Sequence, residues 1–582
     1  MTQIQEESET RKIWLLEDKL TTADSDGSGT PGAFSAVLGS QGSFSGFSDY
    51  DSTVKHDDIA DYGALRPGGA LNLLSFEAFG LLSQYASVGI LMSIFGSLQY
   101  PVFQNYLHME GYQTASYSVL TSLGWSSKIF FGILSDCFPL FGYHRRPYIV
   151  LGWLVCAASC LTMAITPFPA PYYGKPSLVN VPLATISSED LPFINQDAPA
   201  SGSIFIVLTM VASLGYVLAD VAADAMVVHY AQREPAAIRG RIQTAIYLTR
   251  DSFSIVPMLV VGFCLNDYKY GGSFSWSLDP NVLYGALVVP CGLAAYTALV
   301  HLVEEPRVDR LPFPTYVANA WTLLQKRVVW QIAAFNFCFT LFFGYTSTLN
   351  DPVASIWIEI HPLVNTLFGI LYQCCRVLAM FVIGRHALAW DWRVAIAVST
   401  VGLVVVDTMT SLLAIWAVVR DQYVQSAVGA LEAFPIACVF LFGSYLIVEI
   451  AEVGNEGLVF ALLTTCSNLA SPLSTVLAKT VDSFFMARLS DIQRDDHAAR
   501  WQVSYSFIAA AAIRCLSMVF LVLLPRQKVY VQVLKQVGGS NPVAAATVLA
   551  IFFIGYVWNL LTNLLSVFPT TNCLRIAGGK GC

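Results

Sequence analysis

Several charged residues lie inside segments of the sequence that are otherwise apolar. They are Lys128, Asp220, Asp224, Arg250, Asp251 and Arg376. Lys128 stands in LGWSSKIFFGILSD (123–136), eight residues before Asp136. If Asp136 marks a helix end, Lys128 lies about 12 Å deep at 1.5 Å per residue. Counted in the same way, the other charges fall at similar depths in their own segments.

An isolated charge at mid-bilayer costs at least a few kcal/mol, so these side chains are expected to face a common interior and to pair there. We expect Lys128 to pair with Asp220, or with Asp224 or Asp251 if the helices pack differently. Such pairs can also serve only to lock helices together. We favour function over structure here, because ionisable groups inside membranes usually mark transport pathways.

The residue types suggest separate roles. The cations of Lys128, Arg250 and Arg376 suit the carboxylates of an anionic substrate. Asp220, Asp224 and Asp251 are candidates to carry a coupling proton, and Trp125 could stack on a planar ring. An anion that competes for Lys128 would free a carboxylate to take up a proton, which would couple the two.

The next stretch, GILSDCFPLFGYHRRPYI, has the pattern of a gating loop. Gly132 and Asp136 are followed by Gly142, Arg145 and Arg146. A carboxylate at a helix end can face the N-terminus of a neighbouring helix, and the arginines can anchor the loop to carboxylates or lipid phosphates. Flanking positive charge alone could explain the arginines, but not Asp136 with its glycines.

Two further charges, Asp407 and Arg514, are expected to form a structural pair with each other, because their helices would be peripheral in the predicted layout.

The composition is that of a polytopic membrane protein. The chain has 582 residues, of which 55% are hydrophobic and 12% are charged, whereas soluble domains are about a quarter charged. Residues 1–70 hold twelve Asp or Glu against five Lys or Arg and carry most of the net charge of −8. This balance argues against a nucleic-acid partner. We expect residues 1–74 to be a disordered acidic tail, and MTQIQEESET lacks the features of a signal peptide.

Thirteen apolar segments are long enough to span a bilayer. They are residues 78–103, 115–136, 147–167, 203–228, 241–265, 281–303, 329–350, 363–385, 394–419, 428–450, 457–482, 503–524 and 544–568. With the N-terminus inside, fourteen Lys or Arg fall in inner loops and six in outer loops, which favours that orientation.

The spacing predicts an all-α membrane protein with the major facilitator fold, in which two six-helix halves are joined by a central inner loop. The predicted units are a first half at 75–305, a central cytoplasmic loop at 306–328 and a second half at 329–527. Residues 528–582 would form a 13th transmembrane helix and a C-terminal tail outside. In that tail Cys573 and Cys582 could form a disulfide, and lipidation is the alternative if it is cytoplasmic.

The first motif, WSSKIFFGILSDCFPLFGYHRRPY, resembles the folate-biopterin transporter family of the major facilitator superfamily. DVAADAMVV, GRIQ (240–243) and NEGLVFALLTTCSNL (455–469) support the resemblance. It implies a carrier of folates or pterins, with Lys128, Asp220, Asp224 and Gln243 as transport residues. His144 departs from the family pattern where a third arginine is common, as do Glu452 and Val453 where a Pro-Lys pair is frequent.

The sequence therefore predicts a secondary transporter of folate-type or pterin-type anions, coupled to protons. Transport of another metabolite such as S-adenosylmethionine, or a transport-inactive sensor of the same fold, are the alternatives. No metal or catalytic motif and no ATP-binding P-loop stands in the chain, so we expect no enzyme activity and no cofactor. The expected location is a lipid bilayer, with the plasma membrane ahead of an organelle membrane.

Overall fold

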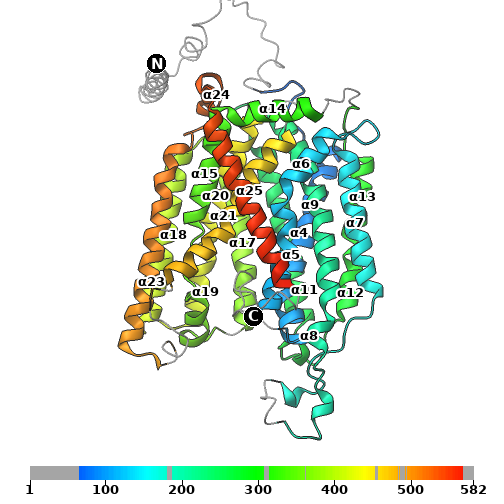
Figure 1. Ribbon diagram of the computed structural model, residues 1–582, viewed down its shortest axis with the longest axis vertical. Coiled ribbons are helices and arrows are strands. Elements are labelled where there is room, and N and C mark those ends of the chain that lie inside the picture. The colour runs from blue at the N-terminus through cyan, green and yellow to red at the C-terminus, as the bar shows by residue number, and fades with distance from the viewer. Residues whose placement is uncertain are drawn as a thin grey trace, which may run out of the picture.

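A computed structural model describes residues 64–109, 111–179, 186–306, 313–360, 362–451, 456–482, 484–485, 492 and 494–567. These residues form a bundle of helices without a named strand (Figure 1). Most of the expected acidic tail, together with Glu452, Val453, Cys573 and Cys582, lies outside the described residues.

The first six predicted segments are helical and form the N-terminal half of the bundle. Its long helices are α4 (Phe76–Ser97), which continues as the π-helix η1 (Gln99–Tyr106), α5 (Gly111–Ser126), α6 (Lys128–Cys137), α7 (Arg146–Ile165), α9 (Ser203–Gln232), α10 (Arg241–Phe253), α11 (Ile255–Cys264), α12 (Pro280–Ala286) and α13 (Val288–Val300). Short turns between them are η2 (Pro176–Leu178), η4 (Leu191–Phe193), α8 (Ala198–Ser201) and η5 (Tyr268–Tyr270).

The next six predicted segments form the C-terminal half. They are α15 (Arg327–Phe343), α17 (Pro362–His386), α18 (Trp392–Ile415), α19 (Gln422–Leu431) with α20 (Ala433–Ile450), α21 (Glu456–Asp482), and α23 (His497–Leu516) with η7 (Ser517–Leu523). The short α16 (Asn350–Pro352) and η6 (Val353–Trp357) lie between α15 and α17.

Three of the helices in the described part of the chain stand outside the two halves. The segment expected as the central loop contains α14 (Phe313–Gln325), which lies across one end of the bundle (Figure 1). A short amphipathic helix, α24 (Lys528–Val537), follows the second half. The predicted 13th segment is α25 (Pro542–Val567), which runs obliquely over the bundle and contacts both α5 and α21 (Figure 1).

Among the described residues, nine helical stretches are long and apolar enough to cross a membrane. Shorter apolar helices are Arg327–Phe343, Leu458–Ser471 and Pro542–Trp558. The protein is thus an integral multi-pass membrane protein. We call the end of the bundle that carries Arg145, Arg239, α14 and α24 the basic face; the other end is the opposite face. From the charge balance of the loops we expect the basic face on the cytoplasmic side.

Several spans are interrupted next to a charge. The second predicted segment breaks at Ser127, so that Lys128 begins α6, and the fifth breaks at Ser254, one turn after Arg250. The tenth breaks at Glu432, between α19 and α20. Interrupted helices within a membrane are tolerated where they line a cavity or are buried in protein. The breaks therefore direct attention to these three places.

Candidate functional site

Lys128 is held between two carboxylates. Its Nζ lies 2.6 Å from Asp220 Oδ2 and 3.0 Å from Asp224 Oδ2, and the side chains of the three residues are 5% exposed or less. Tyr85 of α4 donates its hydroxyl hydrogen to Asp224 at 2.6 Å. The predicted pairing of Lys128 with Asp220 is confirmed, and Asp224, an alternative in the prediction, is a second partner at the same time. This group carries one cation and two anions.

Asp251, the third predicted alternative, takes other partners. Its Oδ2 lies 2.8 Å from Arg376 Nε, and its Oδ1 lies 3.4 Å from Arg250 Nε. Arg250 and Asp251 belong to α10 in the N-terminal half, whereas Arg376 belongs to α17 in the C-terminal half. This second group carries two cations and one anion, and it joins the two halves in the interior of the bundle.

Aromatic rings connect the two charged groups. The ring of Tyr85 meets the ring of Tyr247 edge to face at a centroid distance of 6.3 Å. The guanidinium of Arg250 lies over Tyr247, 4.9 Å from the ring centroid, and that of Arg376 lies 5.4 Å from the centroid of Phe440. Such contacts stabilise buried cations. A net negative group and a net positive group therefore lie side by side.

Two other predicted binding residues take different positions. Trp125 lies beside the first group, with Lys128 Nζ 4.7 Å from its ring centroid. Gln243 is 1% exposed, and neither its amide nitrogen nor its amide oxygen has a hydrogen-bond partner within the described part of the chain. A buried polar group without a partner costs about 1–3 kcal/mol. The side-chain amide of Gln243 could therefore form hydrogen bonds with a bound ligand.

The predicted gating loop joins the two halves at the basic face. Arg145 forms an ion pair with Asp136. The other carboxylate oxygen of Asp136 accepts hydrogen bonds from the hydroxyl of Tyr316 and from the backbone N–H of Leu458, both at 3.0 Å. Leu458 lies in the first turn of α21. The expectation that Asp136 faces a neighbouring helix N-terminus is confirmed.

The remaining loop residues shape and anchor this contact. Gly142 has a φ of +83°, which favours glycine. Gly132 lies buried in α6, where its carbonyl accepts a hydrogen bond from Ser135. Arg146 donates to the carbonyls of Ala298 and Leu299 at the end of α13, where a cation complements the helix dipole. Arg146 therefore anchors the loop within its own half.

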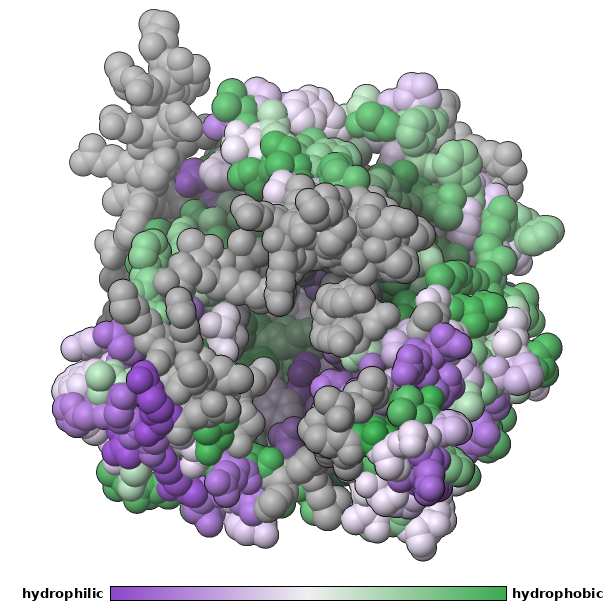
Figure 2. Space-filling model, turned by 60° about the horizontal axis from the view of Figure 1, so that its bottom comes forward, coloured by the Kyte–Doolittle hydropathy of each residue, from purple (hydrophilic) through white to green (hydrophobic). Residues whose placement is uncertain are grey.

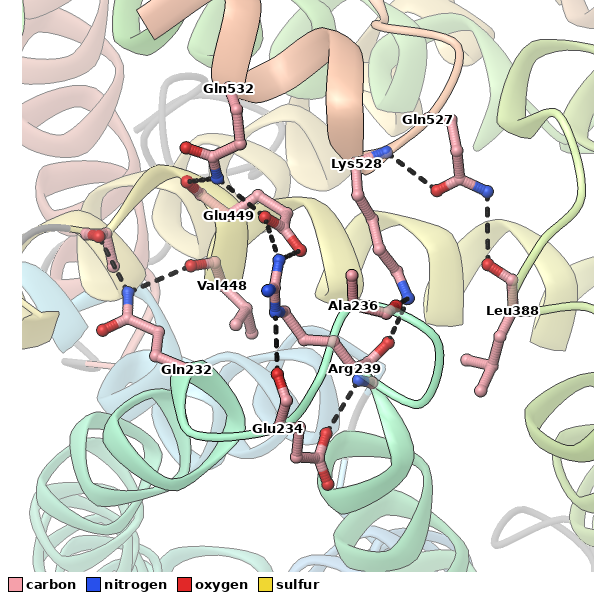
Figure 3. A network of polar contacts seen from close by, with 12 residues as sticks. Gln232, Glu234, Ala236, Arg239, Leu388, Val448, Glu449, Gln527, Lys528 and Gln532 are labelled. Carbon is pink, nitrogen blue, oxygen red and sulfur yellow. Dashed lines mark hydrogen bonds and ion pairs between the residues drawn. The ribbon is translucent and has the colours of Figure 1, made fainter. Parts of the chain in front are cut away.

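A second contact between the halves was not predicted (Figure 3). Arg239, in the turn between α9 and α10, donates to both carboxylate oxygens of Glu449 in α20, each at 2.8 Å. Gln232 donates to the carbonyls of Val448 and Ala451. Arg239 sits in a turn and Glu449 near the end of a helix, where the sequence offers no signal beyond ordinary flanking charge.

The helix α24 also takes part in this contact (Figure 3). Lys528 donates to the carbonyl oxygens of Ala236 at 3.2 Å and of Arg239, and Gln532 donates to Glu449 at 2.7 Å. A segment that follows the C-terminal half therefore holds a turn of the N-terminal half. We call the contacts of Gln232, Arg239, Glu449 and α24 the basic-face lock.

The pKa of Lys528 leads to a testable pH dependence. Burial lowers its pKa to about 8, although Glu449 and Glu234 oppose this and Arg239 adds to it. Since a solvated lysine titrates near 10.4, the folded lock binds fewer protons than the open or unfolded chain between these values. Raising the pH from 7 to 9.5 should therefore stabilise the lock relative to a Lys528→Met variant. Thermal denaturation of both proteins checks this, with Lys175→Met, a lysine with a 40% exposed side chain outside the lock, as the control; equal pH profiles would contradict it.

The opposite face is open where the basic face is closed. A cleft of about 730 Å³ lies between α11 and η1 on one side and η6 and α17 on the other. This face is hollowed near its centre (Figure 2). The lining includes Met258, Gly262 and Gly369, and Arg376 lies two turns further along α17. The cleft therefore leads from the opposite face towards the charged groups.

One group of side chains within the described residues has metal-ligating atoms close together. The Sγ atoms of Cys156, Cys160 and Cys291 lie within 4.8 Å of one another between α7 and α13. All three are buried in the apolar core of the N-terminal half, where thiols pack as small hydrophobic side chains. They are not among the residues predicted for the site.

The architecture defines the class of the protein. Over 77% of its length the chain matches the proton:xylose symporter XylE with a TM-score of 0.50 at 11% identity, covering 95% of that chain. The human organic anion transporter MFSD10 gives the same TM-score and coverage of this chain at 14% identity, covering 98% of that chain. The fold is that of the major facilitator superfamily.

The sequence narrows this class. Residues 89–174 match the BT1 family model. The chain is 23% identical to a folate-biopterin transporter of Synechocystis sp. over 421 residues, which is 69% of this chain and 74% of the relative. It is 20% identical to the probable folate-biopterin transporter 2 of Arabidopsis thaliana over 78% of this chain and 85% of the relative. The resemblance to folate-biopterin transporters is confirmed.

Proposed function

We propose that this protein is a secondary active transporter of folate-type or pterin-type anions, coupled to protons and working by alternating access. The observation that carries the proposal is the pair of charged groups in the interior, where Lys128 meets two carboxylates and two arginines share Asp251. The names of the relatives support the substrate class. The fold supports transport rather than catalysis.

Opposite net charges assign the two groups different roles in this mechanism. The group around Asp251 carries a net positive charge and receives the carboxylate of the substrate on Arg250 and Arg376. The group around Lys128 carries a net negative charge and takes up the proton. Binding of the anion makes protonation more favourable, and protonation makes binding of the anion more favourable. This reciprocal coupling is what a symporter needs.

The closed basic face and the open cleft correspond to one end state of the cycle. Asp136, Arg239 and Lys528 hold the halves together at the basic face. Breaking these contacts while the cleft closes would expose the charged groups to the cytoplasm. We also propose that the loop residues control the opening and closing of the basic face. They are Gly132, Asp136, Gly142, Arg145 and Arg146.

Uptake into vesicles that contain the purified protein tests the function. The panel is folate, biopterin, a methotrexate-like antifolate and S-adenosylmethionine, each with and without an inward proton gradient. We expect uptake of a folate or pterin that rises with the gradient. Uptake of S-adenosylmethionine alone would favour the alternative substrate, and binding without flux for any compound would favour a sensor.

The unpartnered amide of Gln243 gives a prediction that separates binding from folding. Gln243→Met should leave the thermal stability of the empty protein unchanged or raised, because it removes a buried amide that has no hydrogen-bond partner among the described residues. Uptake should fall about tenfold or more, the equivalent of about one lost hydrogen bond of 1.4 kcal/mol. Uptake and thermal denaturation are measured on the same preparation.

Gln331→Met is the matched control. Gln331 donates to the carbonyl of Leu523 at 2.7 Å and so has a structural partner. This variant should lose stability and keep its uptake per folded molecule. If Gln243→Met shows the same pattern as the control, Gln243 does not bind substrate.

A further inference from the structure

A separate cavity lies inside the C-terminal half. It has a volume of about 410 Å³ and is lined by α17, α18, α19 and α23 together with residues 346–360. We call it the side chamber. It shares Ala354, Ile360, Asn365 and Gly369 with the cleft between the halves. A solute that enters the cleft from the opposite face is therefore next to the side chamber.

Residues with oxygen-bearing side chains line the chamber from several helices. They include Ser347, Asn350, Asn365, Thr408, Ser411 and Gln425. Such side chains commonly hydrogen-bond between helices in membranes, but here they surround a cavity. Oxygen atoms of hydroxyls, amides and carboxylates are the ligands of hard cations and also accept hydrogen bonds from ammonium groups.

The described residues of the chamber wall include one arginine, Arg514, which already has partners within the protein. Arg514 forms an ion pair with Asp407, and its Nε donates to the carbonyl oxygen of Tyr345 at 2.6 Å. The predicted pairing of Asp407 with Arg514 is thus confirmed. The Asp407 side chain is 33% exposed, so this carboxylate is accessible from the chamber while it holds the arginine.

A second carboxylate of the chamber has no such partner. Glu432 lies at the break between α19 and α20, inside an apolar span of 29 residues. Among the residues that the structure describes, it makes no ion pair and no hydrogen bond through its carboxylate. With Glu432 ionised, the side chains of Asp407, Glu432 and Arg514 would carry one net negative charge. A charge at this depth that stays unpaired costs a few kcal/mol.

We propose that the side chamber is a binding site for a monovalent cation, held by Glu432 with Asp407 and the surrounding oxygens. The cation is either an inorganic ion of the size of sodium or the ammonium group of an organic ligand. The site shares no charged residue with the groups around Lys128 and Asp251, although Tyr372 on the chamber wall lies next to Arg376 of the second group. It does not depend on the proposed substrate.

Thermal denaturation of the full-length protein in lipid nanodiscs tests the site directly. Sodium chloride or methylammonium chloride replaces N-methyl-D-glucamine chloride at constant ionic strength. At least one of the two cations should raise the Tm of the wild type by about 2 °C or more. A response to sodium alone identifies an inorganic ion, and a response to methylammonium alone identifies an amine.

Two variants connect the shift to the chamber. Glu432→Gln keeps the shape and removes the charge, and Gly429→Leu fills space while keeping every charge, because a Cβ at Gly429 would meet no atom within 4 Å. Both should lose the Tm shift. Glu189→Gln, an exposed carboxylate on the same face, should keep it. No shift in the wild type, or an equal shift in Glu432→Gln, would overturn the proposal.

Discussion

Replacing Lys128 by methionine should abolish uptake, with a loss of at least about 100-fold, while the protein still reaches the membrane. The substitution leaves Asp220 and Asp224 together without a cation, and both are 2% exposed. Removing one partner of a buried ion pair costs about 3–5 kcal/mol, and each 1.4 kcal/mol is a factor of ten. Uptake into vesicles, normalised to the amount of inserted protein, measures the loss.

Neutral combinations separate packing from transport. Lys128→Met with Asp220→Asn should restore thermal stability without restoring uptake, and adding Asp224→Asn removes the last charge of the group. Asp220→Asn alone should retain some substrate exchange but lose its dependence on a proton gradient. Normal transport by the fully neutral variant would mean that the group is only structural.

Lys175→Met is the matched control for this prediction. Lys175 also pairs with an aspartate, Asp190, at 3.0 Å, but the two side chains are 40% and 36% exposed. Exposed pairs of this kind contribute about 0–1 kcal/mol. Uptake by this variant should stay within a factor of two of the wild type.

Replacing Asp136 by asparagine should slow the exchange between the two end states and leave substrate affinity nearly unchanged. Asp136 links α6 to the N-terminus of α21, holds Tyr316 and pairs with Arg145, yet it touches neither charged group in the interior. Losing the charge weakens all three contacts, since hydrogen bonds to a charged group contribute about 1.5–3 kcal/mol. The closed basic face then re-forms more slowly, and this step limits the cycle. The rate of transport should fall about tenfold or more.

Binding and transport can be measured separately for this variant. Equilibrium binding of the best substrate of the panel gives the affinity, and counterflow across the vesicle membrane gives the exchange rate. Asp197→Asn, an exposed carboxylate on the opposite face, is the control and should change neither. A large loss of affinity with a normal exchange rate would place Asp136 in the binding site instead.

The arrangement of the interior charges could be predicted because helix geometry fixes depth. Counting residues from Asp136 was enough to place Lys128 at the same depth as Asp220. Because an unpaired charge in a bilayer is costly, the two side chains were then expected to form an ion pair. Depth alone does not fix rotation about the helix axis. For that reason the sequence left Asp220, Asp224 and Asp251 as alternative partners of Lys128. In the structure Asp220 and Asp224 both pair with Lys128, and Asp251 pairs with the two arginines.

The parts that could not be predicted lie outside the bilayer or depend on several helices at once. The helices α14 and α24 are short and only partly apolar, so they do not stand out among loop residues. The pairing of Arg239 with Glu449 brings together a turn and a helix end 210 positions apart. The side chamber arises from the packing of four helices, and the sequence indicated only the ion pair of Asp407 and Arg514 on its wall.

The oblique course of α25 has a consequence for how the chain assembles during translation. The groove that receives this helix is formed by α5 from one half and α21 from the other, where Tyr556 meets Ser127 and Gly555 packs against Leu469. Neither half offers that groove alone. Because α25 is also the last of these segments to leave the ribosome, it can dock only after both halves have met, and its docking marks the completion of the bundle.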